Sequence, residues 1–197
     1  MNPLAWNCQG LRNPQTVQVF VQRWDPKTIF LCETKLKKRN MEKEKEKAGF
    51  KNGLVIPCMG RSGGLALLWK KDILVEVQGY LNHYIDAIVT DSSSSFKWGI
   101  IGFYRHSKTH KRKESWDMIR ELNRRYSLPW LCFGDFNEIL TIGKKMGGAQ
   151  KNQKQMGDFC EAINKCGFKD LGYNGPDFTW CNMREGEERI YLRLDRA

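Results

Sequence analysis

An acid and an amide stand two positions apart, Asp135 and Asn137, where the apolar run of "WLCFGDFNEIL" at 130–140 ends. In an extended segment, residues two apart face the same side, so these two side chains can act together on one water or one phosphate. The spacing of Asp135 and Glu138 fits a capping box equally well, in which Asp135 accepts hydrogen bonds from backbone amides and Asn137 is incidental. The sequence leaves both interpretations open.

Two earlier apolar runs end in the same way, "LAWN" in Asn7 and "TIFLCE" in Glu33. If these strands lie side by side, their terminal groups converge at one edge of a sheet, where a lone carboxylate is costly to bury unless a cation meets it. Oxygen ligands without a Cys/His set favour Mg²⁺ or Mn²⁺, which completes its shell with water and phosphate oxygens. The alternatives are that Glu33 is an ordinary strand-end surface residue and that Asn7 forms a turn before Gly10.

The elements that must position these groups follow from hydrophobic periodicity. Runs rich in Ile, Val, Leu and aromatic residues predict strands over 4–7, 28–33, 53–57, 64–69, 73–80, 85–90, 97–104 and 130–135. Apolar residues at a spacing of three and four predict helices over 13–24, 113–126 and 155–167, and the alternating charges of 41–47 indicate a solvated helix face with Glu42–Lys45 and Glu44–Lys47 pairs. Strands outnumber helices, which favours a mixed sheet or two stacked sheets flanked by helices.

Composition bounds the class of protein. A chain of 197 residues is long enough for one domain with a sizeable core. The formal net charge of +11 raises the local concentration of polyanions and makes nucleic acid the leading partner, although a basic surface that only maintains solubility is the alternative. Seven cysteines without a CxxC pair indicate reduced thiols in an intracellular compartment. No apolar run approaches the ~18 residues of a membrane span, so we expect no membrane contact.

Six motifs in order carry a family resemblance: "LAWNCQGL", "LCETKL", "GRSGGLALLW", "GDFNEIL", the stretch from Gly147 to Trp180, and "RLDRA". Together they resemble the endonuclease/exonuclease/phosphatase family, and more narrowly the endonuclease domain of plant non-LTR (LINE-type) retrotransposon polyproteins. The resemblance implies an α+β fold, a four-layer α/β/β/α sandwich like deoxyribonuclease I that lacks its last strands. Residues 1–197 would then form a single domain, incomplete at its C-terminus.

The resemblance also implies an activity, which is Mg²⁺- or Mn²⁺-dependent nicking of DNA in the nucleus. The partner beyond DNA would be the reverse-transcriptase region of the same polyprotein. Glu33 in "CETK" matches the metal-binding glutamate of the family, and Asn7 in "WNCQG" matches the asparagine that arranges metal and phosphate. Asp135 and Asn137 in "GDFN" match the pair that activates and orients the attacking water.

Two further residues match the family with open alternatives. Tyr104 in "GFYR" matches a tyrosine that contacts the scissile phosphate, and its alternative is an ordinary aromatic residue at a strand end. Asp195 in "RLDRA" matches an acid that orients a catalytic histidine. Its alternative is a surface salt bridge with Arg193 or Arg196, which would have little energetic consequence.

Two departures from the family pattern bear on activity. Gln9 stands where several family members have a metal-supporting acid. The family closes with a Ser-Asp-His segment past the "RLDRA" motif, whereas this sequence ends at Ala197, so we expect a domain without its terminal catalytic histidine. The three histidines, at 83, 106 and 110, fit a solvent or phosphate contact better than a replacement.

Three functions therefore remain in view. The first is a nicking endonuclease that truncation has weakened or silenced. The second is a catalytically silent fragment that keeps salt-sensitive binding of nucleic acid. The third is a small-molecule phosphatase of the inositol-phosphate type on the same fold, which the charge of +11 disfavours.

Overall fold

A computed structural model describes residues 2–11, 15–91, 95–105, 112–125, 127–172 and 176–197. The chain divides into two compact units. Unit 1 comprises Met1–Tyr104 and Leu128–Gly134, and unit 2 comprises Arg105–Ser127 and Asp135–Ala197. The described residues form mixed β-sheets and four α-helices, so the expected α+β class is confirmed.

The first sheet of unit 1 has the strand order β1-β2-β4-β3. Its strands are β1 (Pro3–Asn7), β2 (Thr28–Cys32), β3 (Asn52–Ile56) and β4 (Leu65–Trp69). All five residues of β2 are buried, because this strand lies inside the sheet and both of its faces are covered. β1 and β2 are parallel, with Asn7 paired to Cys32, and the other neighbours are antiparallel. This register brings the ends of the two predicted metal-binding strands together.

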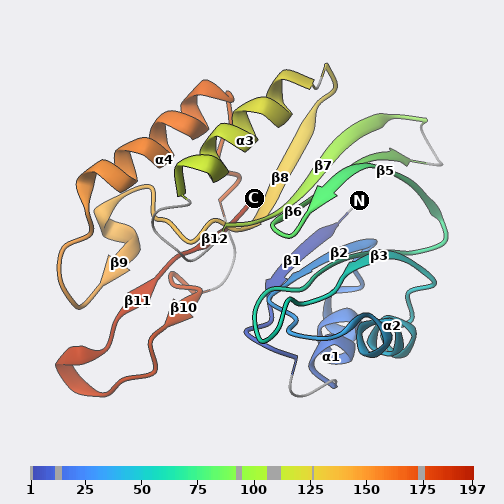
Figure 1. Ribbon diagram of the computed structural model, residues 1–197, viewed down its shortest axis with the longest axis horizontal. Coiled ribbons are helices and arrows are strands. Elements are labelled where there is room, and N and C mark those ends of the chain that lie inside the picture. Colours follow the sequence, from blue (N-terminus) through green and yellow to red (C-terminus); the bar gives the residue numbers. More distant parts are fainter. Residues whose placement is uncertain (1, 12–14, 92–94, 106–111, 126, 173–175) are drawn as a thin grey trace. The chain divides into compact units, whose positions relative to one another are not determined.

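Two helices of unit 1 contribute to the core against the first sheet, α1 (Gln15–Trp24) and α2 (Lys38–Lys47) (Figure 1). Val17 of α1 and Met41 of α2 are buried in one hydrophobic cluster with Ile29 and Leu31 of β2. Both predicted ion pairs of α2 are present, Glu42–Lys45 and Glu44–Lys47. The face is less solvated than expected, however, because Glu44 is buried. The start of the expected helix at 13 lies outside the described residues.

The second sheet of unit 1 packs against the other face of the first. Its strands in unit 1 are β5 (Ile73–Leu81), β6 (Tyr84–Asp91), β7 (Lys97–Tyr104) and β8 (Trp130–Asp135), in the order β8-β7-β6-β5. Asp135, the last residue of β8, belongs to unit 2. Phe30 and Leu67 of the first sheet share a core with Ile100 and Phe133 of the second. The Phe30 ring packs directly on the backbone of Gly102, where an added Cβ would lie 2.2 Å from the ring. Three layers of the expected sandwich, helices and two sheets, are therefore present in unit 1.

Unit 2 contains the remaining helices, α3 (Arg112–Arg125) and α4 (Gln153–Lys165), which pack on each other through a stack of Trp116 and Phe159 with ring centroids 4.6 Å apart. Short elements complete this unit: η2 (Ile142–Lys144), η3 (Gly186–Glu188), β12 (Asp195–Arg196) and a small sheet β10-β11-β9, made of β10 (Trp180–Cys181), β11 (Tyr191–Leu192) and β9 (Lys145–Met146). The sequence predicted both helices and none of these short elements. No helix within the described ranges has the length and apolar character to cross a membrane.

Candidate active site

In unit 1, the predicted metal ligands occupy two adjacent strand ends. Asn7 closes β1, and Glu33 follows β2 directly. The chains stay paired beyond the strands, because the Cys8 amide donates to the Cys32 carbonyl at 2.8 Å and the Gly10 amide donates to the Glu33 carbonyl at 2.7 Å. The backbone of Glu33 is left-handed, with φ of +51°, a conformation that non-glycine residues seldom adopt outside functional or tightly constrained sites.

The Glu33 carboxylate is held from two sides and is 22% exposed. The hydroxyl of Tyr104, the last residue of β7, donates to Glu33 Oε1, and Lys35 Nζ lies 3.7 Å from Oε2. The structure thus brings Asn7, Glu33 and Tyr104 into one region, as the sequence predicted for the first two. Tyr104 is more than an isolated strand-end aromatic, because it fixes one oxygen of the candidate metal ligand.

Cys8 follows Asn7 directly and stays a neutral thiol. Burial is the main cause that raises the pKa of the Cys8 thiol, and the negative charge of Glu33 raises it further. A thiolate would otherwise attract soft metals such as zinc. The oxygen atoms of Asn7 and Glu33 therefore define the donor chemistry at this end of the sheet.

In unit 2, Asp135 and Asn137 contact each other directly. The backbone N–H of Asn137 donates to Asp135 Oδ1 at 2.7 Å, and the side-chain Nδ2 of Asn137 donates to Asp135 Oδ2 at 3.1 Å. Asn137 Nδ2 also donates to the Arg105 carbonyl at 3.0 Å, so both of its donors are used within the protein. Asp135 is 2% exposed, and Asn137 is left-handed with φ of +49°, which Asn tolerates better than most residues. The two side chains contact each other, but through a turn and not through the extended segment from which the sequence predicted a common side. Their joint action on one water or phosphate stays a prediction.

The capping-box interpretation of this segment is wrong. Residues 136–140 form no helix, and the next helical turn, η2, begins only at Ile142. Asp135 does accept a backbone hydrogen bond, but it comes from Asn137 within a tight Asx turn. Glu138, which would have reached back to Asp135, instead forms ion pairs with three basic side chains.

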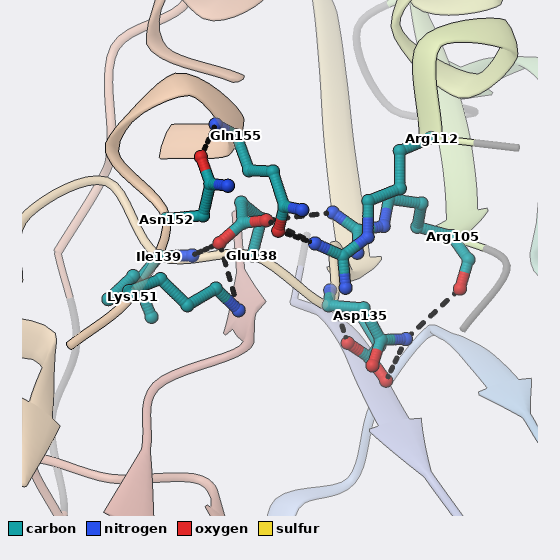
Figure 2. Close-up of polar contacts among 9 residues, drawn as sticks. Arg105, Arg112, Asp135, Glu138, Ile139, Lys151, Asn152 and Gln155 are labelled. Atoms are coloured by element: carbon teal, nitrogen blue, oxygen red, sulfur yellow. Dashed lines mark hydrogen bonds and ion pairs between the residues drawn. The ribbon is translucent and has the colours of Figure 1, made fainter. Parts of the chain in front are cut away.

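The Glu138 cluster, which we define as Glu138 with Arg105, Arg112 and Lys151, was not predicted from the sequence (Figure 2). Oε2 of Glu138 lies 3.3 Å from Arg105 Nη1 and 3.2 Å from Arg112 Nη1, and Oε1 lies 3.1 Å from Lys151 Nζ. Both Glu138 and Arg105 are completely buried. Polar residues that follow an apolar strand, as Arg105 follows "KWGIIGFY", are usually read as surface charges, and only the apolar flanks of Glu138 in "FNEIL" hinted otherwise.

Arg105 remains a cation in this setting. Burial, with a contribution from the neighbouring charge of Arg112, lowers the pKa of Arg105 to about 10, while Glu138 and Asp135 oppose that effect. The guanidinium also lies over the Trp116 ring at 5.3 Å. At neutral pH the Glu138 cluster therefore carries three positive charges and one negative charge.

Asp195 lies elsewhere in unit 2, in β12. Burial is the main cause that raises the pKa of its carboxyl group, against opposing effects from Thr179 and Arg193. Asp195 Oδ1 is buried and has no hydrogen-bond partner among the residues that the structure describes. Arg196, one of the two proposed salt-bridge partners, forms its ion pair with Asp170 instead, at 2.6 Å.

Gln9 and His83 lie in the described part of the chain. The Gln9 side chain is exposed, and its backbone amide donates to Asn7 Oδ1 at 3.0 Å. His83 packs edge-on against Tyr84, with ring centroids 5.5 Å apart. His106 and His110 lie outside the described residues.

The oxygen donors of unit 1 fit a hard divalent cation. Within the described part of the chain, no group of three or more His, Cys, Asp or Glu side chains is placed to hold a metal. The protein can therefore offer one carboxylate from Glu33 and the amide oxygen of Asn7, which suits Mg²⁺ or Mn²⁺ because Mg²⁺ usually keeps several waters and binds one or two carboxylates plus phosphate oxygens. The meeting of this group with Asp135 and Asn137 of unit 2 stays a prediction.

A known protein family matches most of this chain. The model of the Endonuclease/Exonuclease/phosphatase family matches residues 4–186. No curated protein sequence gave a significant match. Among solved structures, the chain is similar to AP endonuclease LMAP from Leishmania major, with a TM-score of 0.74, 17% identity, and coverage of 98% of this chain and 76% of that chain.

Two further structures are similar over the same length. The endonuclease domain of TRAS1, a telomere-specific non-LTR retrotransposon, has a TM-score of 0.71 at 13% identity and covers 98% of this chain and 82% of its own. The 3′ phosphatase NExo from Neisseria, bound to a product DNA hairpin, has a TM-score of 0.67 at 15% identity and covers 98% and 83%. At such identities the likeness shows the fold, and the expected deoxyribonuclease-I-like class is confirmed.

Proposed function

Because the chain belongs to the endonuclease/exonuclease/phosphatase family, we propose that it is a metal-dependent phosphodiesterase that nicks DNA. The observation that carries this proposal is the buried, hydrogen-bonded Asp135–Asn137 pair. The net charge of +11 supports a polyanionic substrate. The DNA hairpin bound to the Neisseria phosphatase and the endonucleases among the similar structures support DNA in particular.

In the proposed reaction, Asp135 is the general base that accepts a proton from the attacking water. Asn137 orients that water, because both hydrogens of Nδ2 are already donated to Asp135 Oδ2 and the Arg105 carbonyl. Its carbonyl oxygen, Oδ1, is therefore the atom that can accept the second hydrogen of the water. A fixed acceptor of this kind places the oxygen of the water for in-line attack on phosphorus.

Glu33 and Asn7 would hold the divalent cation, and Tyr104 would keep the Glu33 carboxylate in place. When bound, the cation supplies positive charge that stabilises the phosphate as it gains negative charge. A direct contact of Tyr104 with the scissile phosphate, as the family resemblance implies, is also part of the proposal. The proposed function requires residues 1–197 to act as one domain, in which Glu33 and Asn7 work on the same phosphate as Asp135 and Asn137.

Asp195 would orient a catalytic histidine, as its counterpart in the family motif does. Its buried Oδ1, which lacks a partner among the described residues, supports a role as a hydrogen-bond acceptor for an imidazole N–H. No histidine of this sequence matches the family motif, so the proposal assigns the orienting acid and no histidine.

We further propose that the domain derives from a non-LTR retrotransposon of the plant LINE type, with a reverse-transcriptase region as its partner in a nuclear, reducing environment. The ordered motifs and the likeness to the TRAS1 endonuclease domain support this origin. All seven cysteines lie in the described part of the chain and form no disulfide there, which suits a reducing compartment.

The test is nicking of supercoiled plasmid with Mg²⁺, compared with EDTA. Asp135→Asn and Glu33→Gln should each abolish or greatly reduce nicking. Asp72→Asn and Glu42→Gln are the matched controls, because both acids form ion pairs at the surface of unit 1. The controls should nick as the parent chain does.

A second candidate function is binding of nucleic acid without cleavage, which the exposed, neutral Gln9 beside Asn7 favours. If the parent chain nicks no faster than Asp135→Asn while both still retard DNA at low salt, the enzyme proposal fails and the binding function replaces it. A loss of binding on raising salt would be common to both functions.

A further inference from the structure

The segment that carries the proposed base is attached to the interior of unit 2. Asp135 and Asn137 hydrogen-bond to each other, whereas Phe136 and Glu138 point into the interior of unit 2. The Phe136 ring lies 5.6 Å from that of Phe159, which stacks on Trp116. The interior side of the segment therefore has both an apolar and an ionic attachment.

The main chain of Arg105 holds both ends of the Asp135–Asn137 turn. Its amide donates to the Asp135 carbonyl at 2.9 Å, and its carbonyl accepts from Asn137 Nδ2 at 3.0 Å. A displacement of the Arg105 main chain would therefore move the side-chain amide of Asn137, which orients the proposed water.

The side chain of Arg105 is in turn held by Glu138 (Figure 2). It also lies over the Trp116 ring. Glu138 uses both carboxylate oxygens, because Oε2 accepts from Arg105 and Arg112 and Oε1 binds Lys151 and the Ile139 amide. These contacts form a closed circuit. Asn137 Nδ2 binds the Arg105 carbonyl, the Arg105 guanidinium pairs with Glu138, and Glu138 is the residue that follows Asn137 in the chain.

From this circuit we propose that Glu138 and Arg105 are positioning residues, whose buried ion pair holds the Asp135–Asn137 pair in its reactive geometry. This inference rests on the proposed function, since it assigns the residues that support the proposed base. Both residues would act through the Asp135–Asn137 pair and not on the phosphate itself.

Stability alone is a poor account of the Glu138 cluster. One carboxylate faces three cations, and Nε and Nη2 of the fully buried Arg105 have no hydrogen-bond partner within the described residues. Buried charges cost several kcal/mol of desolvation each, and apolar residues of the same volume often replace such clusters without loss. Catalytic side chains must be positioned within about 0.5 Å, and this requirement gives a reason why a cluster with so high a desolvation cost is retained.

The first measurement is steady-state nicking by Glu138→Gln, Arg105→Lys and the double variant. We expect kcat to fall about 10- to 100-fold with KM changed less than about threefold, because a displaced base slows chemistry more than DNA binding. The double variant should lose no more than the worse single variant, since both act through one ion pair. Glu44→Gln is the matched control, because Glu44 is also buried and ion-paired, to Lys47 in α2, and should keep the parental kcat.

The second measurement does not require activity. The side-chain amide resonance of Asn137 in a ¹H–¹⁵N spectrum, identified by its loss in Asn137→Asp, reports the hydrogen bonds to Arg105 and Asp135 directly. We expect it to move in Glu138→Gln and Arg105→Lys and to stay in place in Glu44→Gln. Arg105→Lys keeps the charge, so it serves if Glu138→Gln does not fold by circular dichroism.

The outcomes separate this inference from the proposed function. If the parent chain does not nick DNA but the Asn137 resonance moves as expected, the enzyme proposal falls and the positioning role stands. An Asn137 resonance that stays in place in both variants overturns the positioning role, whatever the kinetics. A kcat that stays parental in an active chain overturns it as well, even if the resonance moves.

Discussion

Two buried or half-buried glutamates show how differently the two units treat a carboxylate. Glu33 in unit 1 keeps 22% of its side chain exposed and has one hydroxyl and one lysine near it. Glu138 in unit 2 is completely buried and contacts three cations and a backbone amide. The first has coordination capacity left for an exchangeable ion, whereas the second has every oxygen committed. An acid that must bind and release a ligand and an acid that must hold a structure still are thus distinguishable by their partners.

The largest expected effect is on stability, where the two glutamates should differ most. Glu138→Ala leaves the fully buried Arg105 and the partly exposed Arg112 and Lys151 without their anion, and it should lower the free energy of unfolding by about 3–5 kcal/mol. Glu33→Ala removes a partly exposed carboxylate and should cost less than about 1 kcal/mol. Urea denaturation of both variants at neutral pH measures the difference. Equal losses would mean that the burial of Glu138 carries no special energetic weight.

The order should reverse when the metal requirement is measured. Glu33→Gln should raise the Mg²⁺ concentration for half-maximal nicking by about 10- to 100-fold, because a ligating charge is lost. Glu138→Gln should leave that concentration within about threefold while it lowers kcat. Magnesium titrations of the nicking rate separate the two effects. A similar shift of the Mg²⁺ requirement in both variants would break the distinction between a ligand and a support.

The sequence predicted those features that depend on neighbouring residues and missed those that depend on residues far apart in the chain. The strand runs and the ends at Asn7, Glu33 and Asp135 could be read locally, because period-two patterns and apolar blocks reflect burial of single strands. The spacing of two suggested the Asp135–Asn137 contact, but the contact forms through a turn with a left-handed Asn137 and not through extended backbone. The role of Glu138 could not be predicted, because its partners come from positions 105, 112 and 151, and no local pattern encodes which distant cation will meet a buried acid.

The same limit explains the other differences. Residues 180–196 form strands of two residues whose pairing rests on distant segments, such as Tyr191 with Met146, so their periodicity is too short to detect. The capping box failed because the Asp135–Glu138 spacing of three does not by itself fix a helix start, and Asp135 instead forms an Asx turn with Asn137 that the Arg105 main chain also contacts.

A smaller effect is expected from the hydroxyl that holds Glu33. Tyr104→Phe removes one hydrogen bond to a carboxylate and should weaken Mg²⁺-dependent nicking by about 1 kcal/mol, or roughly fivefold. Tyr80→Phe, on the exposed part of β5, is the matched control. The nicking rate at limiting Mg²⁺ is the measurement. A loss of 100-fold or more would instead indicate that Tyr104 acts on the phosphate itself, which would sharpen its place in the mechanism.

The smallest effect concerns Asp195, the other acid of unit 2 that is largely buried. Burial raises the pKa of its carboxyl group in the folded state above the unfolded value of about 3.9, so the folded protein prefers the protonated form. That preference contributes stability fully below the unfolded pKa and is lost as the pH rises through the raised folded pKa. Asp195→Asn cannot ionise, so it should be more stable than the parent chain at neutral pH and gain nothing near pH ~4.

Urea midpoints of the Asp195→Asn variant and the parent chain across this pH range measure the effect, with Asp158→Asn on the exposed face of α4 as the control. The control should show no such pH-dependent gain. Unlike Glu138, Asp195 has a buried oxygen without a partner in the described residues, so its removal relieves a cost where removal of Glu138 creates one. A loss of stability at neutral pH would show that the charge of Asp195 is paired in the folded protein, and it would place this acid with Glu138 as a structural anion.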